Sequence, residues 1–118
     1  MEAIADRVIG RWFTPAFLTR RPDAVAAIKA QLLATPPEGY AATCEALAAM
    51  DLRDDLPRIF ASTRVIAAAE DQSTPPEQSE EIARRIPGAD LVVIPNAAHL
   101  ANVEQPEIVT NLVLNRVQ

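Results

Sequence analysis

Apolar side chains recur at helical spacing through residues 1–50, and prolines interrupt the pattern. Ile4, Val8 and Trp12 follow one another every four residues and predict a helix with one apolar face. This helix should end near Trp12, because Thr14 precedes a proline and a residue in that position avoids the helical region. Two further apolar sets follow later prolines and predict two more helices: Val25, Ile28 and Leu32, then Tyr40, Cys44, Leu47 and Met50.

The tetrapeptide Thr-Pro-Pro-Glu occurs at residues 35–38 and again at residues 74–77. In both places we expect a helix start, with the threonine as N-cap and the glutamate three residues later completing a capping box. The prolines fit such a start because the first helical positions need no backbone donor. Local helix chemistry therefore explains the repeat, which does not indicate an internal duplication.

Residues 51–118 show a different pattern, in which two short apolar runs flank a segment of helix length. The runs at residues 65–69 and 91–94 are bounded by turn residues, which is typical of buried strands in a parallel sheet. Residues 75–86 predict a helix that stops at a Pro-Gly pair, and Pro106 opens a last helix. The expected α/β order is three helices, a connector, strand, helix, strand and helix.

Two parallel strands do not complete a sheet by themselves, because the outer side of each strand keeps backbone N–H and C=O groups without a hydrogen-bond partner. Neither strand alternates apolar with polar residues, so both faces of the pair should be covered. The apolar stripes of the first two helices also need a surface to rest on. We therefore expect a larger sheet, completed by an N-terminal partner chain, by another copy in a homo-oligomer, or by sequence outside these residues.

Composition and charge narrow the possible partners. Eleven basic against 16 acidic residues give a net charge of −5 without any basic run, which argues against nucleic acid because phosphates need a basic surface. No apolar run is long enough to span a bilayer, so we expect no membrane association. The single cysteine, Cys44, should be buried on its helix, and it excludes an internal disulfide and a cysteine-based metal site. We expect a cytoplasmic protein with no cofactor and no metal.

The candidate chemistry lies at the ends of the two predicted strands. Asp71 follows the first strand, and His99, the single histidine, follows the second. Ligands bind at the carboxyl ends of strands in open α/β sheets, and adjacent strands lie about 5 Å apart, so we expect the Asp71 carboxylate to bond to His99. An imidazole oriented by a carboxylate is an acid–base catalyst near neutral pH. Three alternatives remain: an ordinary surface histidine, an ordinary turn aspartate, or Glu70 in place of Asp71.

Four segments resemble one enzyme superfamily. Residues 65–76, VIAAAEDQSTPP, resemble the strand and acid loop of α/β-hydrolases, and residues 96–107, NAAHLANVEQPE, resemble their histidine loop and last helix. The segments RWFTP at 11–15 and TPPEGY at 35–40 look most like the lid of 3-oxoadipate enol-lactonases. Two departures are visible. An Ala-Ala pair stands before the acid where family members usually carry a glycine, and the chain has neither a Gly-x-Ser-x-Gly nucleophile elbow nor an oxyanion-hole loop.

This resemblance implies the C-terminal part of an α/β-hydrolase fold, with residues 1–50 as a helical lid and residues 51–118 as the end of the core. It implies that the predicted Asp–His pair is catalytic and that the substrate is a small anionic enol-lactone or ester. Trp12 would then face the substrate, and Arg11 would meet its carboxylate. Ordinary packing of Trp12 and solvation of Arg11 are the alternatives.

Two functions remain open. In the first, the chain is the lid and acid–base part of an enol-lactone hydrolase that forms 3-oxoadipate in aromatic catabolism, and its serine nucleophile stands elsewhere. In the second, it is a truncated or remodelled chain without catalysis that acts as an oligomerising or interaction module. Ser62, Ser73 and Ser79 lack the elbow context, so we expect the isolated chain not to hydrolyse esters.

Overall fold

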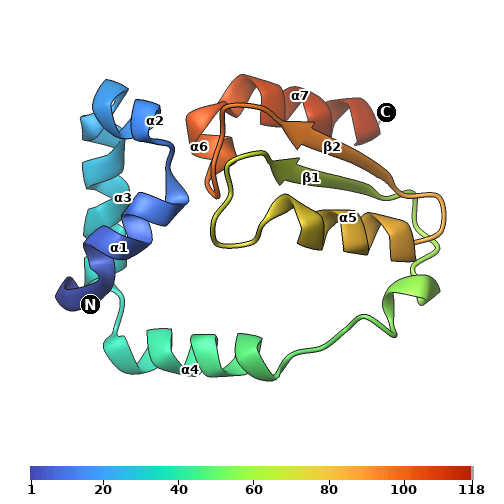
Figure 1. The fold of residues 1–118 in the computed structure, drawn as a ribbon, viewed down its shortest axis with the longest axis horizontal. Coiled ribbons are helices and arrows are strands. Elements are labelled where there is room, and N and C mark those ends of the chain that lie inside the picture. Colours follow the sequence, from blue (N-terminus) through green and yellow to red (C-terminus); the bar gives the residue numbers. More distant parts are fainter. Residues whose placement is uncertain (118) are drawn as a thin grey trace.

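The chain folds as an α/β protein with helices in its first part and two strands in its second (Figure 1). The computed structural model describes residues 1–117; Gln118, the last residue of the predicted core segment, lies outside them. The elements are α1 (Glu2–Trp12), α2 (Pro15–Arg20), α3 (Pro22–Ala34), α4 (Pro37–Ala49), a 3-10 turn (Leu56–Arg58), β1 (Arg64–Ala68), α5 (Pro76–Arg85), β2 (Asp90–Ile94), α6 (Ala101–Glu104) and α7 (Pro106–Val117). The predicted order is confirmed, and the short helices α2 and α6 are added to it.

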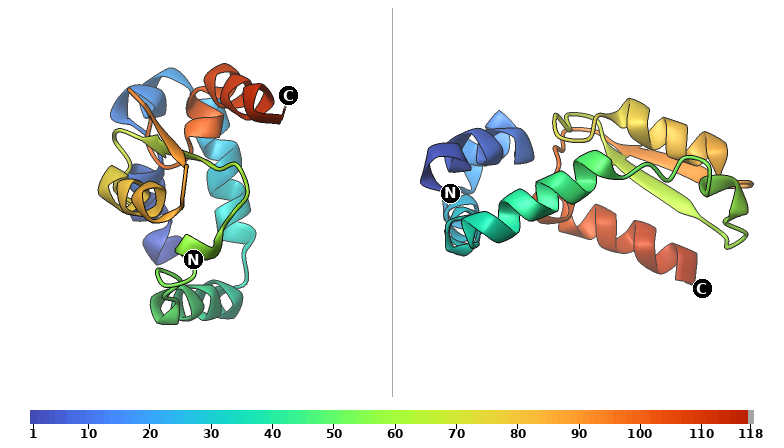
Figure 2. Two further views of the ribbon diagram at one scale, coloured as in Figure 1. Left: turned by 90° about the vertical axis from the view of Figure 1, so that its right-hand side faces the viewer. Right: turned by 90° about the horizontal axis from the view of Figure 1, so that it is seen from below.

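The two strands pair in parallel, and their last residues, Ala68 and Ile94, stand opposite each other. Helix α5 covers one face of this pair and α7 covers the other, as the turned views in Figure 2 show. Ala68, Ile94 and Ala97 form a buried core, against which Val109 and Leu112 of α7 pack. Because both faces are covered, neither strand needs alternating polar residues.

Helices α1, α2 and α3 share a second core, whose buried residues are Ala5, Ile9, Phe13, Phe17 and Leu32. The buried face of α1 is thus shifted by one residue from the predicted stripe. Val8 and Trp12, which belong to that stripe, are half-buried at the margin of the helical core. Val25 and Ile28 of α3 pack against the same core. The predicted stripes of these two helices are therefore covered in part within the chain, because the helices pack on one core.

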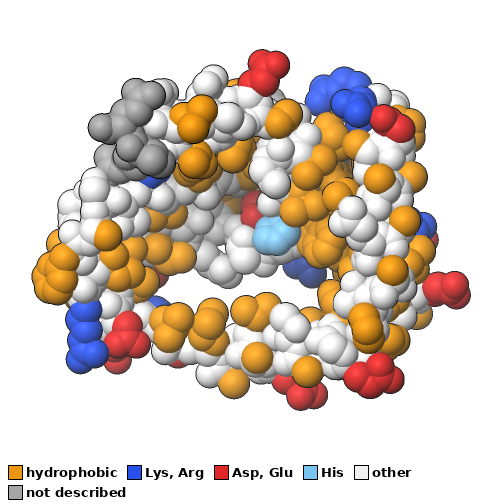
Figure 3. Space-filling view, turned by 180° about the vertical axis from the view of Figure 1, so that it is seen from behind, with side chains coloured by type: hydrophobic (Ala, Val, Ile, Leu, Met, Phe, Trp, Pro, Cys, Tyr) orange, Lys and Arg blue, Asp and Glu red, His pale blue; other side chains and the backbone are white. Residues whose placement is uncertain are grey.

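Helix α4 leaves this helical core and runs as an arm toward the sheet (Figures 1 and 2). Tyr40, near its start, packs against the helical core, but α4 contains no buried residue. Cys44, Leu47 and Met50 are exposed, so the prediction that Cys44 is buried is wrong. Figure 3 shows an opening between this arm and the body of the molecule. The spacing predicted the α4 helix correctly, but it did not predict that the apolar face of this helix is exposed.

The two Thr-Pro-Pro-Glu segments begin helices, but neither forms the predicted capping box. Pro36 and Pro75 hold the N-cap positions of α4 and α5, and no side chain caps either helix. Each threonine therefore stands one residue too far from its helix. The Thr35 hydroxyl instead donates to the Gln31 carbonyl at 3.2 Å, and the Thr74 hydroxyl donates to a carboxylate beside the histidine.

Candidate active site

The loops that follow β1 and β2 are tied together by backbone hydrogen bonds. The Ala69 amide donates to the Ile94 carbonyl and the Glu70 amide donates to the Ala97 carbonyl, both at 2.9 Å. The parallel pairing thus continues beyond the strands and keeps both loops at the same edge of the sheet. The next residue, Asp71, faces His99, whereas the Glu70 side chain is exposed.

The Asp71 carboxylate is held from several sides. Oδ1 accepts from the amides of Ser73 and Thr74 at 2.8 and 2.9 Å, and Oδ2 accepts from the Thr74 hydroxyl at 2.8 Å. Oδ2 also lies 2.9 Å from His99 Nδ1, as the strand-end argument predicts. Asp71 is therefore a turn residue and the partner of the histidine at once, so these two interpretations of the sequence are compatible.

The environment of Asp71 keeps it ionised. Burial opposes ionisation, but the hydrogen bonds from the Thr74 amide, His99, the Thr74 hydroxyl and the Ser73 amide outweigh it and lower the pKa of the carboxyl group. An ionised carboxylate accepts hydrogen bonds and cannot donate, so Nδ1 of the imidazole must carry the shared proton. Nε2 then holds the lone pair that can accept a proton.

The cost of replacing Asp71 by asparagine should depend on pH. Because the folded-state pKa lies below the ordinary value, the carboxylate stabilises the fold above that ordinary value, and its contribution disappears as the pH falls through the folded-state pKa. Urea unfolding of the native chain and of Asp71→Asn at roughly pH 7 and roughly pH 3 should show a smaller difference in unfolding free energy at the acidic pH. A difference that grows on acidification would contradict this prediction.

His99 lies in the hollowed face shown in Figure 3, with 31% of its side chain exposed. The Trp12 ring stacks on the imidazole, with ring centres 6.2 Å apart and planes inclined by 30°. The Thr74 hydroxyl oxygen lies 3.3 Å from Nδ1, on the side of the Asp71 contact. Nε2 makes no hydrogen bond to the described residues, so it is the nitrogen that a reacting group would meet.

Asn96 and Gln105 shape the loop that carries His99. Asn96 adopts a φ of 54°, a left-handed conformation that asparagine tolerates better than most residues. The Gln105 side-chain amide donates to the carbonyls of Pro95 and Asn96 at 2.6 and 2.9 Å. This bridge from the end of α6 fixes the turn between β2 and the histidine.

The end of α1 contacts both site loops. The Leu100 amide donates to the Trp12 carbonyl at 3.0 Å, and the Arg11 guanidinium donates to the Gln72 carbonyl at 2.8 Å. Both predicted substrate residues are therefore near the Asp71–His99 pair. Trp12 is half-buried against the histidine ring, and Arg11 is exposed beside the acid loop.

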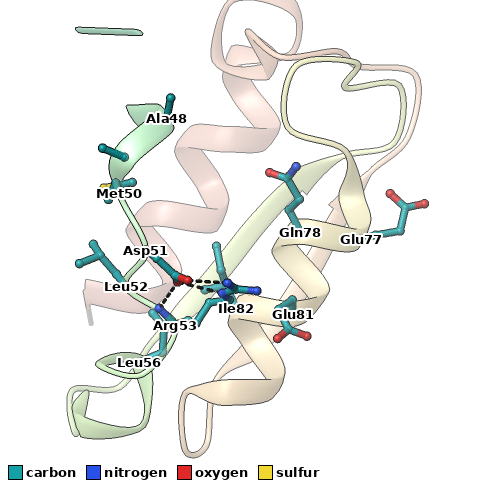
Figure 4. Close-up of a pocket in the computed structure, with 11 residues that line it drawn as sticks. Ala48, Met50, Asp51, Leu52, Arg53, Leu56, Glu77, Gln78, Glu81 and Ile82 are labelled. Atoms are coloured by element: carbon teal, nitrogen blue, oxygen red, sulfur yellow. Dashed lines mark hydrogen bonds and ion pairs between the residues drawn. The ribbon is translucent and has the colours of Figure 1, made fainter. Parts of the chain in front are cut away.

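A hollow of about 370 Å³ is lined by Trp12, Ile28, Gln31, Leu32, Thr35, Tyr40 and Leu100. Two of these residues are neighbours of His99, since Trp12 stacks on its ring and Leu100 follows it in the chain, but His99 itself does not line the hollow. A larger hollow, of about 740 Å³, lies between the end of α4, the connector and α5 (Figure 4). It contains the Asp51–Arg53 ion pair, but no residue of the two site loops lines it.

Sequence reasoning gave Thr74 only a capping role, and it missed Gln105 and Glu104. Glu104 is 6% exposed and accepts hydrogen bonds from Thr14 and Ala98. Periodicity could not reveal this contact, because Thr14 and Glu104 are 90 positions apart. The available signal was the position of Glu104 and Gln105 inside residues 96–107, the segment that resembles a hydrolase histidine loop.

Within residues 1–117, no helix is long and apolar enough to cross a membrane. The same part of the chain contains no group of three or more histidine, cysteine, aspartate or glutamate side chains placed to hold a metal ion.

Fold and site together define an α/β protein with an Asp–His pair at the carboxyl ends of adjacent parallel strands. The alpha/beta hydrolase family matches residues 2–112, and the chain belongs to this family. A similar protein is 3-oxoadipate enol-lactonase 2 of Acinetobacter baylyi, which is 38% identical over 107 residues, 91% of this chain and 40% of that protein.

Solved structures show the same likeness. The enol-lactonase from Burkholderia xenovorans LB400 superposes with a TM-score of 0.96 at 38% identity, over 99% of this chain and 45% of that one. A hydrolase from Pseudomonas aeruginosa PA01 superposes with a TM-score of 0.93 at 40% identity, over 99% of this chain and 44% of that one. The predicted resemblance to enol-lactonases is confirmed, and the chain spans less than half the length of these proteins.

Proposed function

We propose that the chain is the lid and acid–base part of a hydrolase that opens enol-lactones or related esters. The observation that carries this proposal is the 2.9 Å contact between Asp71 Oδ2 and His99 Nδ1 at the ends of adjacent parallel strands. The enol-lactonases of A. baylyi and B. xenovorans suggest the substrate class. A cytoplasmic location and a part in aromatic catabolism belong to the same proposal.

In this mechanism His99 Nε2 takes the proton of an attacking oxygen, from a serine hydroxyl or from water, as that oxygen bonds to the lactone carbonyl carbon. The ring C–O ester bond then breaks, and the imidazolium returns the proton to the departing enol oxygen. Where serine attacks, water repeats the sequence and releases the acyl group. Asp71 keeps Nδ1 protonated and stabilises the positive ring, and the amides that hold its carboxylate limit reorganisation.

We assign substrate binding to the hollow lined by Trp12 and Leu100. Trp12 covers one face of the imidazole and also lines this hollow, so it would contact a substrate that reaches Nε2. Arg11 would bind a substrate carboxylate. One of its five N–H donors is bonded to the Gln72 carbonyl, which holds the guanidinium near the site while other donors remain for an anion.

Residues 1–118 contain no Gly-x-Ser-x-Gly. We propose that the nucleophile and the oxyanion hole come from a polypeptide segment that pairs with the two-stranded sheet, which has an outer edge on each strand within residues 1–117. The exposed side chains of Leu52, Phe60 and Val93 and the uncovered arm α4 mark the surface for this segment. Without it, two copies would cover this surface for each other.

Light scattering at micromolar concentration should therefore give the isolated chain a mass above that of one copy. One driving force is the set of unpaired backbone N–H and C=O groups on the strand edges, each costing about 1–3 kcal/mol if buried without a partner. The other is the apolar surface around Phe60, a residue that is 90% exposed. Phe60→Ser, which leaves the strand edges untouched, should weaken this association without abolishing it. A monodisperse monomer that melts cooperatively would show that the chain closes its own core.

A chimera tests the proposed function. Residues 1–118 replace the matching part of the A. baylyi enol-lactonase, and hydrolysis of 3-oxoadipate enol-lactone is followed with the isolated chain as control. We expect turnover by the chimera and none by the isolated chain. A chimera that is folded by circular dichroism but hydrolyses neither this lactone nor simple esters would favour the non-catalytic interaction module.

A further inference from the structure

Glu104 stands between the lid and the histidine loop without touching the Asp71–His99 pair. Its carboxyl group is buried, with 6% of the residue exposed. Oε1 accepts from the Thr14 amide at 2.9 Å and from the Ala98 amide at 3.2 Å, while Oε2 accepts from the Thr14 hydroxyl at 2.8 Å. A buried acidic side chain is rare and costly unless its oxygens are bonded, and here both oxygens are.

The groups that bond to Glu104 lie on two segments far apart in the sequence. Thr14 forms the turn between α1 and α2, and its hydroxyl oxygen also accepts from the Phe17 amide at 3.2 Å, which caps α2. Ala98 immediately precedes the histidine. Glu104 therefore joins the lid turn, which is the turn between α1 and α2 at Thr14, to the loop that carries His99.

A second bond holds the same two segments on the other side of His99. The Leu100 amide donates to the Trp12 carbonyl at 3.0 Å. With the Glu104 bonds to Thr14 and Ala98, residues 98–100 are attached to the lid both before and after the histidine. Between these two attachments the Trp12 ring lies against the imidazole, at a centre-to-centre distance of 6.2 Å.

We propose that Glu104 is a positioning residue, which holds the lid turn on the histidine loop and thereby keeps the Trp12 ring stacked on His99. The inference rests on the proposed function only in treating His99 as the base. Its consequence is that the lid and the general base move as one unit. The wall of the substrate hollow would then keep its place relative to Nε2 when other parts of the lid shift.

Two substitutions of Glu104 should differ in their effect on its hydrogen bonds. Glu104→Ala leaves the Thr14 and Ala98 amides without an acceptor in a buried place, so the Glu104 part of the attachment should be lost. The Leu100–Trp12 backbone bond that remains should not be enough to keep the two rings stacked. Glu104→Gln can keep it, because the amide oxygen accepts from both backbone amides and the NH2 group donates to the Thr14 hydroxyl oxygen. Glu107→Gln, at an exposed glutamate in the first turn of α7, is the matched control.

The chain has one tryptophan and one histidine, so their contact can be measured without ambiguity. An imidazolium quenches the fluorescence of an indole that it touches, so Trp12 emission should fall when acidification protonates the imidazole. We expect the native chain, Glu104→Gln and Glu107→Gln to show this quenching. Glu104→Ala should lose it, together with the nuclear Overhauser contacts between the two rings.

Should Glu104→Ala fail to fold, Thr14→Ala compared with Thr14→Ser decides the question. The Thr14 hydroxyl bonds to Glu104 and caps α2 through the Phe17 amide, and serine can restore both bonds. A loss of quenching in Thr14→Ala that serine restores is therefore assigned to Glu104 when the helix content by circular dichroism is unchanged. A folded Glu104→Ala chain that keeps both the quenching and the ring contacts overturns the proposal. Neither readout uses ester hydrolysis, so an inactive chimera would count against the proposed function and not against this inference.

Discussion

Replacing His99 with alanine in the chimera should lower kcat for enol-lactone hydrolysis by about 10⁶-fold, which is the order of loss when a serine hydrolase loses its histidine. Without the imidazole, no group beside Asp71 can take the proton of the attacking oxygen or return it to the leaving enol. KM should change little, because Trp12 and Tyr40 still line the hollow. Initial rates over a range of lactone concentrations separate the two constants.

Asn102→Ala is the matched control for His99→Ala. Asn102 is exposed in α6, three residues beyond the histidine, and its replacement should leave kcat almost unchanged. Unchanged turnover in the His99→Ala chimera would exclude His99 as the base. Hydrolysis by the isolated chain that His99→Ala abolishes would instead reveal a nucleophile within residues 1–118.

Replacing Asp71 with asparagine should lower kcat in the chimera by about 10⁴-fold, with little change in KM. Oδ1 accepts from two backbone amides, those of Ser73 and Thr74, so the asparagine oxygen should occupy that position. Its NH2 group then faces His99 Nδ1, which must become an acceptor. The ring proton moves to Nε2, and that nitrogen can no longer act as a base.

Glu70→Gln is the control for Asp71→Asn, because it removes the neighbouring carboxylate. The Glu70 side chain is exposed, and the contact of this residue with the histidine loop is a backbone bond to the Ala97 carbonyl. Its substitution should leave kcat and KM close to those of the unaltered chimera. A large fall in kcat for Glu70→Gln, with Asp71→Asn still active, would assign the orienting role to Glu70.

Local sequence patterns were sufficient for every element except the 3-10 turn and the short helices α2 and α6, and for the Asp–His pair at the strand ends. The apolar runs before Asp71 and before His99 lack alternation, and this predicted two parallel strands covered on both faces. Residues that follow adjacent parallel strands must emerge at one edge of the sheet. The contact between Asp71 and His99 could therefore be predicted from chain position alone.

Local patterns do not specify which residues become neighbours in space. Only the tertiary structure decided these contacts. The spacing of Cys44 and Leu47 predicted a helix, yet only the arrangement of α4 shows that their face is uncovered. Thr74 has the local signature of a helix cap, but its hydroxyl bonds to Asp71 because Pro75 takes the cap position. Glu104 shows no periodic signal, because its burial depends on Thr14, 90 positions away. Hydrogen bonds between remote segments form only once the chain is folded, so the sequence determined the Asp–His pair and the tertiary structure determined what holds it.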